Sequence, residues 1–540
     1  MNAATSNRAL PWLLWATFLA AAALLFTGLG HYPLWDDEAM DGLSAQSILQ
    51  TGDTTARVGH NLVAYRNGLL LAPPKGDTGS LRIGMPPLTA YGAAVSMRLF
   101  GQSAWAARLP SVLCGLACVG LMLWWLWQSR VALVPAAVFA IALLGNVSFF
   151  LYARQCRYYG VSMLLFTAIA YLYLHEKGRR GRLLALGGCA AALMAANPMF
   201  FVLLSGCLLG DYLIWQRKVR RFKAVEWAIY LAPQVIVGCI LLAWWNPLQT
   251  QQGGALFQNT LRERALLLWW NLRDLNNSEM ILGVLLVAAP WVAFAARNVW
   301  LKRALCAFVI YFVGLTLLSP QILHETTVAD VRYLSAILPL CIAIEALTLC
   351  ALFGYFSWPA WVAIPSALLL FGTNSLHGGP FFREGLRSTL VAFVGEEMHP
   401  NADPYTVTIR WINEHVREGQ SIWVLPEAMT YPLIFHAPKA VYAWQLQQPV
   451  KERFATLPRI HFYGAEPPDY IILFGPLLGT VEKVLENFDV GYYEEEAILP
   501  VFWRDLYRPE IIWRCFTPVT QFKPTVMGIT ILKRKPAPMR

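Results

Sequence analysis

Charged residues are scarce in this sequence, and their scarcity excludes most soluble proteins. Only 14% of the 540 residues are Asp, Glu, Lys or Arg, whereas soluble domains carry about 25%. Hydrophobic residues reach 57% and gather in long runs. The net charge of +10 does not predict a nucleic-acid partner, because Lys and Arg lie in short clusters between apolar runs, as in positive-inside membrane topology. We therefore expect a polytopic protein that contacts membrane lipids and binds no nucleic acid.

Several common motifs are also missing. The ten cysteines form no CxxC pair, and most of them lie inside apolar runs, where a thiol behaves as a small buried hydrophobe. No Gly-rich phosphate loop is present, which argues against a nucleotide-binding domain. No internal repeat is visible, which argues against transporters built from repeated halves. The first apolar run lacks a convincing cleavage site, so we interpret it as a retained signal anchor.

What the sequence does contain is a series of apolar runs of membrane-spanning length, roughly 17–25 residues. They predict about eleven transmembrane helices, at 10–30, 108–128, 132–151, 158–174, 183–197, 199–215, 225–246, 278–296, 303–319, 334–353 and 356–373. Two of these runs, 183–197 and 199–215, are separated by Asn197-Pro198, which predicts either a tight turn or a kink.

The basic loops give an orientation for these helices. If the helices alternate, three basic segments fall on the same side, at 177–182, 217–223 and 297–303. That side should be the cytoplasm, so the N-terminus is expected to be cytoplasmic. The segments expected outside are 31–107, 247–277, 320–333 and everything after about 373.

The chain therefore divides into two predicted domains. Residues 1–373 form a transmembrane domain, whose first external loop, 31–107, is structured by helices near 37–50 and 88–99. Residues 374–540 form a soluble external domain. A helix at 403–418 and strands at 421–425, 440–443, 469–474 and 527–533 predict an α/β fold with a largely parallel sheet.

An acidic stretch directly after the first apolar run is the sharpest chemical signal. It contains Asp36, Asp37, Glu38 and Asp41. Carboxylates beside a membrane are costly and repel one another, although acids at a helix start also favour capping. We predict that Asp37 is a catalytic base, with its neighbours Asp36 and Glu38 as further catalytic candidates.

The order and spacing of short motifs over residues 1–350 resemble the GT-C superfamily of membrane glycosyltransferases, in the branch of aminoarabinose transferases and protein O-mannosyltransferases. The motifs are Leu34-Trp35…Asp37-Glu38, Met85-Pro86-Pro87-Leu88, Leu99-Phe100-Gly101, Ala107-Arg108-Leu109-Pro110, Tyr152…Arg154…Arg157-Tyr158 and Arg332-Tyr333. The resemblance implies a GT-C fold, a polyprenyl-phosphate sugar donor such as undecaprenyl or decaprenyl phosphate, and inversion at the anomeric carbon. It also implies that Asp37 is the acid that activates the acceptor.

One family feature is absent. The family often carries a Lys directly before the Pro-Pro pair, where this sequence has Gly84-Met85. Lys75 or Arg82, in an apparently lengthened loop, are expected to take over its contact with the donor phosphate. The departure leaves the donor sugar and any metal open, so we predict no certain cofactor and keep a divalent metal as an option.

Cations at external helix ends are the predicted partners of the departing phosphate. They are Arg154, Arg157 and Arg332, with Tyr333 beside the last of them; contact with lipid headgroups is the alternative interpretation. Substrate-lining residues are expected in the same external segments: Tyr158, Tyr91, Asp274 and His324.

The sequence thus predicts an inverting glycosyltransferase that moves a sugar to a lipid, glycan or protein acceptor in the periplasm. Three alternatives stay open. The chain could be an oligosaccharide ligase or polymerase of similar architecture, or a transporter or flippase of lipid-linked sugars. The C-terminal domain could also be the main functional part and bind an acceptor or partner.

Overall fold

The computed structural model describes most of the chain. The described residues are 3–64, 71–72, 82–83, 86–175, 179–244, 259–277, 279, 281–319, 321, 330–376, 386, 388–400, 403–447, 457–475, 478–488, 493–503 and 525–535.

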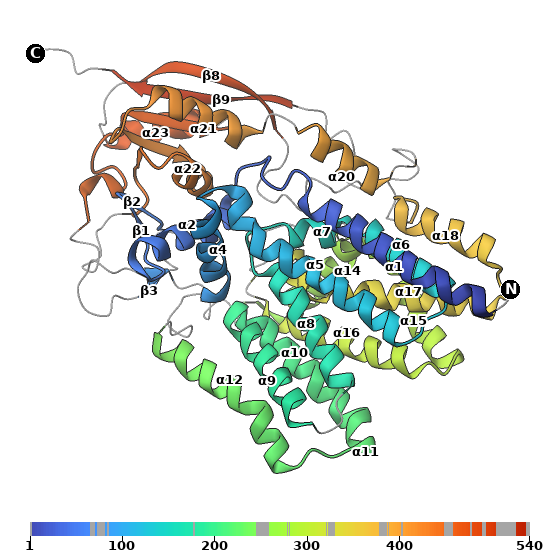
Figure 1. The fold of residues 1–540 in the computed structure, drawn as a ribbon. Coiled ribbons are helices and arrows are strands. Elements are labelled where there is room, and N and C mark those ends of the chain that lie inside the picture. Colours follow the sequence, from blue (N-terminus) through green and yellow to red (C-terminus); the bar gives the residue numbers. More distant parts are fainter. Residues whose placement is uncertain are drawn as a thin grey trace, which may run out of the picture.

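Each apolar run predicted to span the membrane coincides with a helix or a helix pair (Figure 1). These are α1 (Ala3–Phe26), α5 (Ala104–Gln128), α6 (Leu133–Gly145), α7 (Val147–Ala153), α8 (Tyr159–Leu174), α9 (Arg180–Ala196), α10 (Pro198–Asp211), α12 (Ala224–Trp244), α15 (Gly283–Ala295), α16 (Val299–Leu318), α17 (Leu338–Tyr355) and α18 (Ala360–Gly372). Among the described residues, six helices are long and apolar enough to cross a membrane, or seven if one bent pair is a single span. The helices α8, α15 and α18 are apolar but shorter. The prediction of a multi-pass helical membrane protein is confirmed.

Two asparagines break apolar runs into separate helices. The run 132–151 is bent by 59° between α6 and α7, where Asn146 leaves the helical conformation and its side chain accepts the N–H of Phe149. Asn197 caps α10 in the same way, through the N–H of Phe200. Pro198 then occupies the first helical position, which tolerates proline. The pair 183–197 and 199–215 is therefore two helices joined by a tight turn.

Further elements extend or connect these helices. A π-helix, η1 (Tyr212–Gln216), and the short α11 (Arg217–Val219) continue α10. The amphipathic α14 (Leu261–Asn277) precedes α15, and the 3-10 helix η4 (Val331–Ile337) leads into α17.

The first loop is structured, as predicted. Its helices are α2 (Asp36–Thr51) and α4 (Pro87–Phe100), which pack against each other. Two short antiparallel pairs lie between them: β1 (Arg57–Val58) with β2 (Asn61–Leu62), and β3 (Leu71–Ala72) with β4 (Arg82–Ile83).

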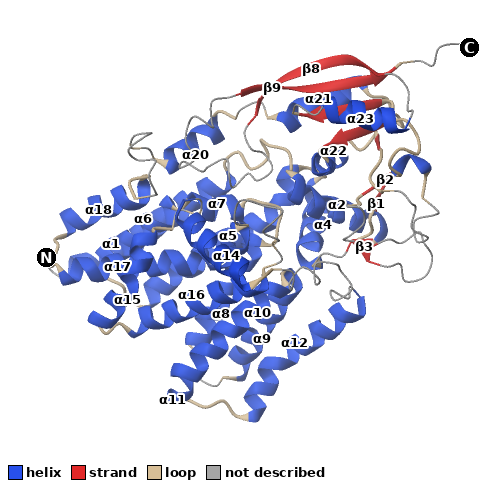
Figure 2. Cartoon of the chain, turned by 180° about the vertical axis from the view of Figure 1, so that it is seen from behind, coloured by secondary structure: helices blue, strands red, loops and turns tan. Residues whose placement is uncertain are grey.

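The C-terminal region is an α/β domain built on a five-stranded sheet (Figure 2). Its helices are α20 (Thr389–Met398), α21 (Pro404–His415), α22 (Thr430–His436) and α23 (Leu478–Phe488). The strands are β5 (Ser421–Leu425), β6 (Val441–Tyr442), β7 (Tyr470–Phe474), β8 (Tyr493–Trp503) and β9 (Thr525–Arg534), in the order β6-β5-β7-β9-β8.

The expectation of a largely parallel sheet is wrong. β5 is parallel to β6 and β7, but β9 is antiparallel to both β7 and β8. The sequence analysis missed β8, because its run of acids, Glu494 to Glu496, hides the apolar alternation. In the structure β8 is an edge strand that exposes one face to solvent, and Glu496 pairs with Lys533 of β9 at 3.0 Å.

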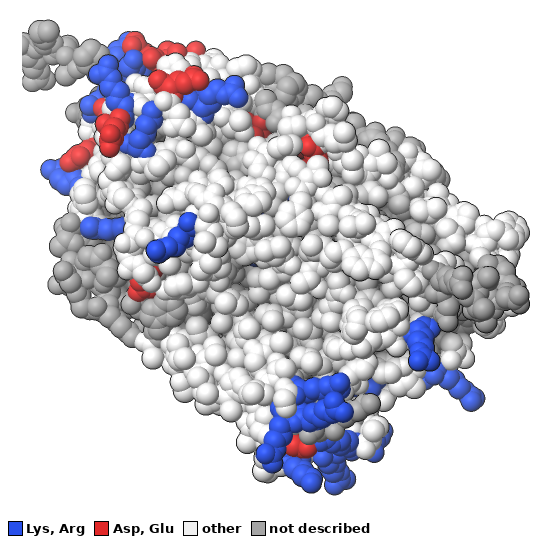
Figure 3. All heavy atoms as spheres, viewed as in Figure 1, with Lys and Arg blue, Asp and Glu red and all other residues white. Residues whose placement is uncertain are grey.

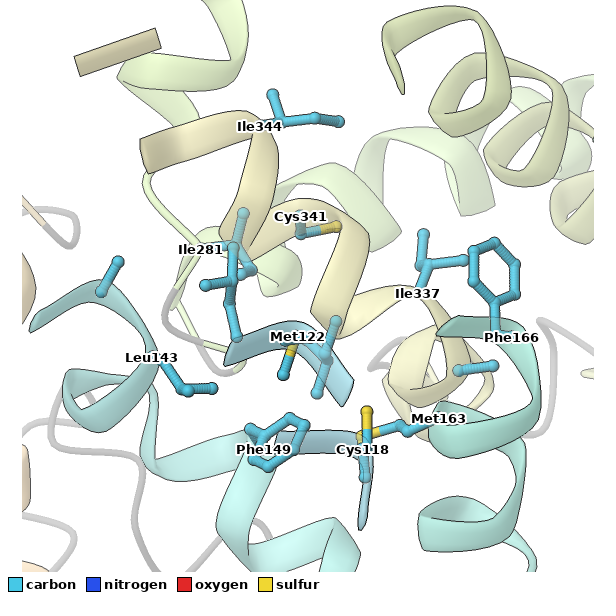
Figure 4. Packing of buried hydrophobic residues seen from close by; sticks show 14 of the residues in the cluster. Cys118, Met122, Leu143, Phe149, Met163, Phe166, Ile281, Ile337, Cys341 and Ile344 are labelled. Carbon is cyan, nitrogen blue, oxygen red and sulfur yellow. The ribbon is translucent and has the colours of Figure 1, made fainter. Parts of the chain in front are cut away.

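The two largest hydrophobic clusters among the described residues hold the molecule together. One lies among the helices and includes Cys118, Met122, Phe149 and Cys341 (Figure 4). The other joins the first loop to the C-terminal domain, with residues of α2 packed in one cluster with residues of α22 and the sheet. The predicted domain boundary near 373 therefore separates two parts of the chain whose apolar side chains share a core.

Charged side chains gather at two ends of the molecule, and few lie on the face between them (Figure 3). Basic side chains dominate the end where α11 lies, and both signs occur around the C-terminal sheet. The exposed side chains of the intervening helices include Trp291, Phe294, Val235 and Leu209. Large apolar side chains exposed over so broad a face are expected where lipid covers the protein.

Candidate active site

The acidic stretch begins helix α2. Trp35 is extended, and Asp36 is the first helical residue. Asp36 Oδ1 accepts the N–H of Asp37 at 2.6 Å, and Glu38 Oε2 accepts the N–H of Trp35 at 3.3 Å. Acids in a first helical turn satisfy free N–H groups and interact favourably with the helix dipole. Local capping therefore fixes the start of α2 and with it the directions of the acidic side chains.

Glu38 forms a closed ion pair with Arg108 of α5. Arg108 Nε and Nη2 donate to the two carboxylate oxygens at 3.0 and 2.6 Å. Glu38 also accepts the N–H groups of Trp35 and Cys156. A carboxylate has about four acceptor positions, and all are occupied here. Glu38, predicted as a further catalytic residue, is fully buried, and its contacts are those of a structural ion-pair partner.

Asp37 lies between two guanidinium groups from distant segments. Arg332, at the start of η4, contacts Asp37 Oδ2, and Arg157, between α7 and α8, lies 3.5 Å from the same oxygen. Arg157 Nη1 also donates to the carbonyl oxygen of Asp37 at 3.0 Å and to Asp41 Oδ2 at 2.9 Å. Asp330 binds Arg332 Nε at 2.9 Å. The structure thus brings together three of the residues predicted from the sequence, Asp37, Arg157 and Arg332.

Arg157 and Arg332 have N–H donors that the neighbouring carboxylates do not use. A guanidinium carries five N–H donors. Within the described part of the chain, no acceptor lies in hydrogen-bond distance of Arg157 Nε, although this nitrogen is buried. The rings of Tyr158 and Tyr333 lie against the two guanidinium groups, with Arg157 Cζ 5.2 Å and Arg332 Cζ 5.5 Å from the ring centroids. The aromatic rings hold the arginines in place without using their N–H groups.

Burial and charge pairing have opposite effects on the pKa values of the residues around Asp37. Burial lowers the pKa of Arg157, but the carboxylates of Asp37 and Asp41 outweigh it and hold the pKa well above its ordinary value. Burial raises the pKa of Asp41 to about 6, although Arg157 opposes the shift. A guanidinium is not deprotonated in proteins, so Arg157 and Arg332 are permanently charged. Asp41 is the member that titrates near neutral pH.

Three other predicted residues lie elsewhere. Arg154 is predicted at the donor phosphate, but its guanidinium pairs with Glu397 of α20 at 2.7 Å and bonds the carbonyl oxygen of Leu24. Asp274 pairs with its neighbour Arg273 on α14, at 2.7 Å. The hydroxyl of Tyr91 on α4 donates to the carbonyl oxygen of Gly52. These contacts do not involve Asp37.

The remaining predicted residues cannot be placed against Asp37. Lys75 and His324 lie outside the described residues, and Arg82 lies in β4 with a side chain that is not described. Among the described residues, no three His, Cys, Asp or Glu side chains are grouped to hold a metal ion. The carboxylates of Asp37 and Asp41 both contact guanidinium groups, which makes this position a poor fit for a divalent cation.

The sequence analysis missed the structural partners of the site. It places Arg108 in a motif without a role, and it gives Asp330 no role at all. The signal for Arg108 was a charged residue at the start of an apolar run, because a buried charge needs a partner. The signal for Asp330 was its spacing of two residues from Arg332.

Comparisons with known proteins agree with this architecture. Residues 85–245 match a family model described as dolichyl-phosphate-mannose-protein mannosyltransferase. The structure is similar to ArnT from Cupriavidus metallidurans in the apo state, with a TM-score of 0.59, 15% identity and coverage of 97% of this chain and 98% of that one. It is also similar to the same enzyme bound to undecaprenyl phosphate, with a TM-score of 0.55, 14% identity and coverage of 95% and 97%. No curated protein sequence matches the chain.

These findings confirm the predicted resemblance to the GT-C membrane glycosyltransferases and the predicted GT-C fold. The family match covers residues 85–245 of the 540 residues, and the similarity to ArnT is one of fold. The roles of individual side chains stay predictions.

Proposed function

We propose that this chain, with its GT-C fold, transfers one sugar from a polyprenyl phosphate to an acceptor outside the cytoplasmic membrane. The observation that carries the proposal is the meeting of Asp37 with Arg157 and Arg332, three residues from three separate segments. The match of residues 85–245 to a mannosyltransferase family supports the reaction class. The similarity to ArnT bound to undecaprenyl phosphate supports the lipid part of the donor.

The chemistry divides between the carboxylate and the two arginines. The acceptor hydroxyl attacks the anomeric carbon, and Asp37 takes its proton as general base. The bond between that carbon and the phosphate oxygen breaks, and its electron pair leaves with the phosphate. Attack opposite the leaving group inverts the anomeric centre, through a transition state with oxocarbenium character.

Arg157 and Arg332 stabilise the charge that develops on the departing phosphate. A planar guanidinium matches the geometry of phosphate oxygens, and the Arg332 side chain, which is 19% exposed, is open to them. The same cations keep Asp37 ionised until it receives the acceptor proton. No step requires a divalent metal from the described residues; a metal stays an option for the parts of the first loop that lie outside them.

We propose a bacterial inner membrane as the location, with a cytoplasmic N-terminus and a periplasmic C-terminal domain. The basic end of the molecule around α11, opposite the C-terminal sheet, supports this orientation, since Lys and Arg favour the cytoplasmic side. The acceptor is a lipid, glycan or protein, and the carboxylate chemistry does not distinguish among them.

The test is transfer by the purified protein from a defined polyprenyl-phosphate sugar. Asp37→Asn keeps the size of the side chain and removes the base, so we expect transfer to fall about 10²–10⁴-fold with an unchanged elution volume in detergent. Asp36→Asn is the matched comparison, because it changes the neighbouring carboxylate, and it should retain most of the activity. Full activity of Asp37→Asn would contradict the mechanism.

The alternatives give different results in the same system. An oligosaccharide ligase or polymerase would prefer a multi-sugar donor to the single-sugar one. A flippase would move labelled donor across proteoliposomes without consuming it.

A further inference from the structure

The backbone that leads into the catalytic helix is held by the C-terminal region. The N–H of Leu34, three residues before Asp37, donates to Nε2 of His436 at the end of α22, at 3.1 Å. The hydroxyl of Tyr32 donates to Glu396 Oε1 on α20 at 3.0 Å. Arg108 binds the carbonyl oxygens of Tyr32 and Pro33. The backbone just before α2 is therefore held by both domains. Arg108 of the membrane domain binds its carbonyl oxygens, and His436 of the C-terminal domain binds an N–H group.

His436 is suited to accept this hydrogen bond. Nε2 accepts only when it carries no proton. Burial, with a contribution from the charge of Arg108, lowers the pKa of His436 to about 4. The ring is therefore neutral at physiological pH, and Nε2 can accept the N–H of Leu34.

Close packing between α2 and α22 leaves little freedom for the catalytic helix to shift. A Cβ atom at Gly42 would lie 2.9 Å from Phe435 Cε2 and 2.7 Å from Leu34 Cδ1. Glycine at this position therefore lets α22 approach the backbone of α2 directly. Close packing of this kind transmits a displacement of one helix to the other, because packed interiors do not compress.

A second contact reaches the segment that carries Arg157. Glu397 of α20 pairs with Arg154, three residues before Arg157. Gly28 makes room for it: this residue has a φ of +64°, and a Cβ there would overlap Glu397 Oε2. The ring of Phe393, on the same helix, lies 5.3 Å from Arg154 Cζ. The C-terminal region therefore contacts the segments before both Asp37 and Arg157.

We propose that the C-terminal domain positions the transfer machinery: His436 acts through Leu34 on Asp37, and Glu397 acts through Arg154 on Arg157. The inference rests on the proposed function, since it concerns the placement of the base and of a phosphate-binding arginine. Neither His436 nor Glu397 touches the reacting atoms, so both are positioning residues. Their substitution should affect different kinetic constants, because one supports the base and the other supports a phosphate contact.

The first test replaces His436. In Gln the amide reaches the position of Nε2, whereas Asn is too short, so His436→Gln should retain activity that His436→Asn and His436→Ala lose. We expect kcat to fall about 10–100-fold in the Asn and Ala variants, the cost of a small misplacement of a reacting group, with the donor KM within about twofold of its starting value. His415→Ala, an exposed residue on α21, is the control and should leave both constants unchanged.

The second test replaces Glu397. Glu397→Ala should raise the donor KM about tenfold, equivalent to the loss of about 1.4 kcal/mol of binding, and leave kcat within about twofold. Glu397→Gln retains an acceptor for Arg154 and should recover part of the affinity. The matched control is Glu414→Ala, on the exposed face of α21.

The outcomes separate this inference from the proposed function. If Asp37→Asn is inactive but the Gln and Asn variants of His436 have equal kcat, the positioning role of His436 is wrong. The proposed role of Asp37 as the general base then still stands. If the His436 and Glu397 variants both lose kcat and donor affinity to the same extent, the two residues only stabilise the fold. That result would overturn the proposal. If Asp37→Asn is fully active, the proposed function itself fails, whatever the other variants do.

Discussion

The adjacent carboxylates of Glu38 and Asp37 both pair with arginine, but their arginines differ in how many N–H donors are already used. Arg108 uses all five of its N–H donors: two on Glu38 and three on the carbonyl oxygens of Leu29, Tyr32 and Pro33. The arginines at Asp37 are shared among several carboxylates and leave donors unused. The first arrangement is complete without any ligand, whereas the second has capacity to bind an anion. The number of unused donors, not the presence of an ion pair, separates the structural pair from the candidate site.

The largest effect is expected when the ion pair between Glu38 and Arg108 is broken. Arg108→Met would leave Glu38 buried and without its cation, at a cost of about 3–5 kcal/mol. We expect little folded protein, measured as the monodisperse fraction in detergent and the midpoint of thermal unfolding. The double variant Glu38→Met with Arg108→Met should recover part of the loss, because no charge is then buried. A stable Arg108→Met variant would contradict the structural role of the pair.

A smaller and different effect is expected at the second group. Arg332→Gln removes a partly exposed cation that contacts Asp37, so we expect the donor KM to rise about 10–100-fold, in line with about 1.5–3 kcal/mol for a charged hydrogen bond. Thermal stability should change much less than for Arg108→Met. Arg459→Gln, with 76% of its side chain exposed, is the control. An unchanged donor KM in Arg332→Gln would remove this arginine from the phosphate site.

The smallest effect concerns pH. Because burial raises the pKa of Asp41 from 3.8 to about 6, the folded chain holds a proton between these values that the unfolded chain has lost. Stability from this group is therefore full below about pH 4, decreases as pH rises to about 6 and is constant above it, with a slope of about 1.4 kcal/mol per pH unit. Asp41→Asn should flatten the slope in thermal unfolding measured from about pH 4 to 7. An unchanged slope would mean that Asp41 does not titrate there.

The sequence was sufficient for features that depend on local patterns. Apolar runs located the membrane helices, and the acids after the first run located the start of α2. The motifs that contain Arg157 and Arg332 identified two residues that the fold brings to Asp37, since the helices between them return the chain to the same end of the bundle.

The sequence was insufficient where a side chain chooses among distant partners. Arg154 and Arg157 lie three residues apart in the turn between α7 and α8, yet one faces Glu397 and the other faces Asp37. Nothing in their spacing predicts this division, because it depends on how α20 packs against the membrane domain. The ion pair of Glu38 was missed for the same reason, since its partner Arg108 is 70 residues away.

The hydrophobic core shared by α2 and the C-terminal sheet has a consequence for synthesis of the chain. Membrane helices insert as they leave the ribosome, and α2 can pack against α4 as soon as both have been made. The contacts of α2 with α22 (Thr430–His436) form only after that helix has been made. A nascent chain stalled before residue 420 would be inserted in the bilayer and still lack the contacts that α22 makes with α2.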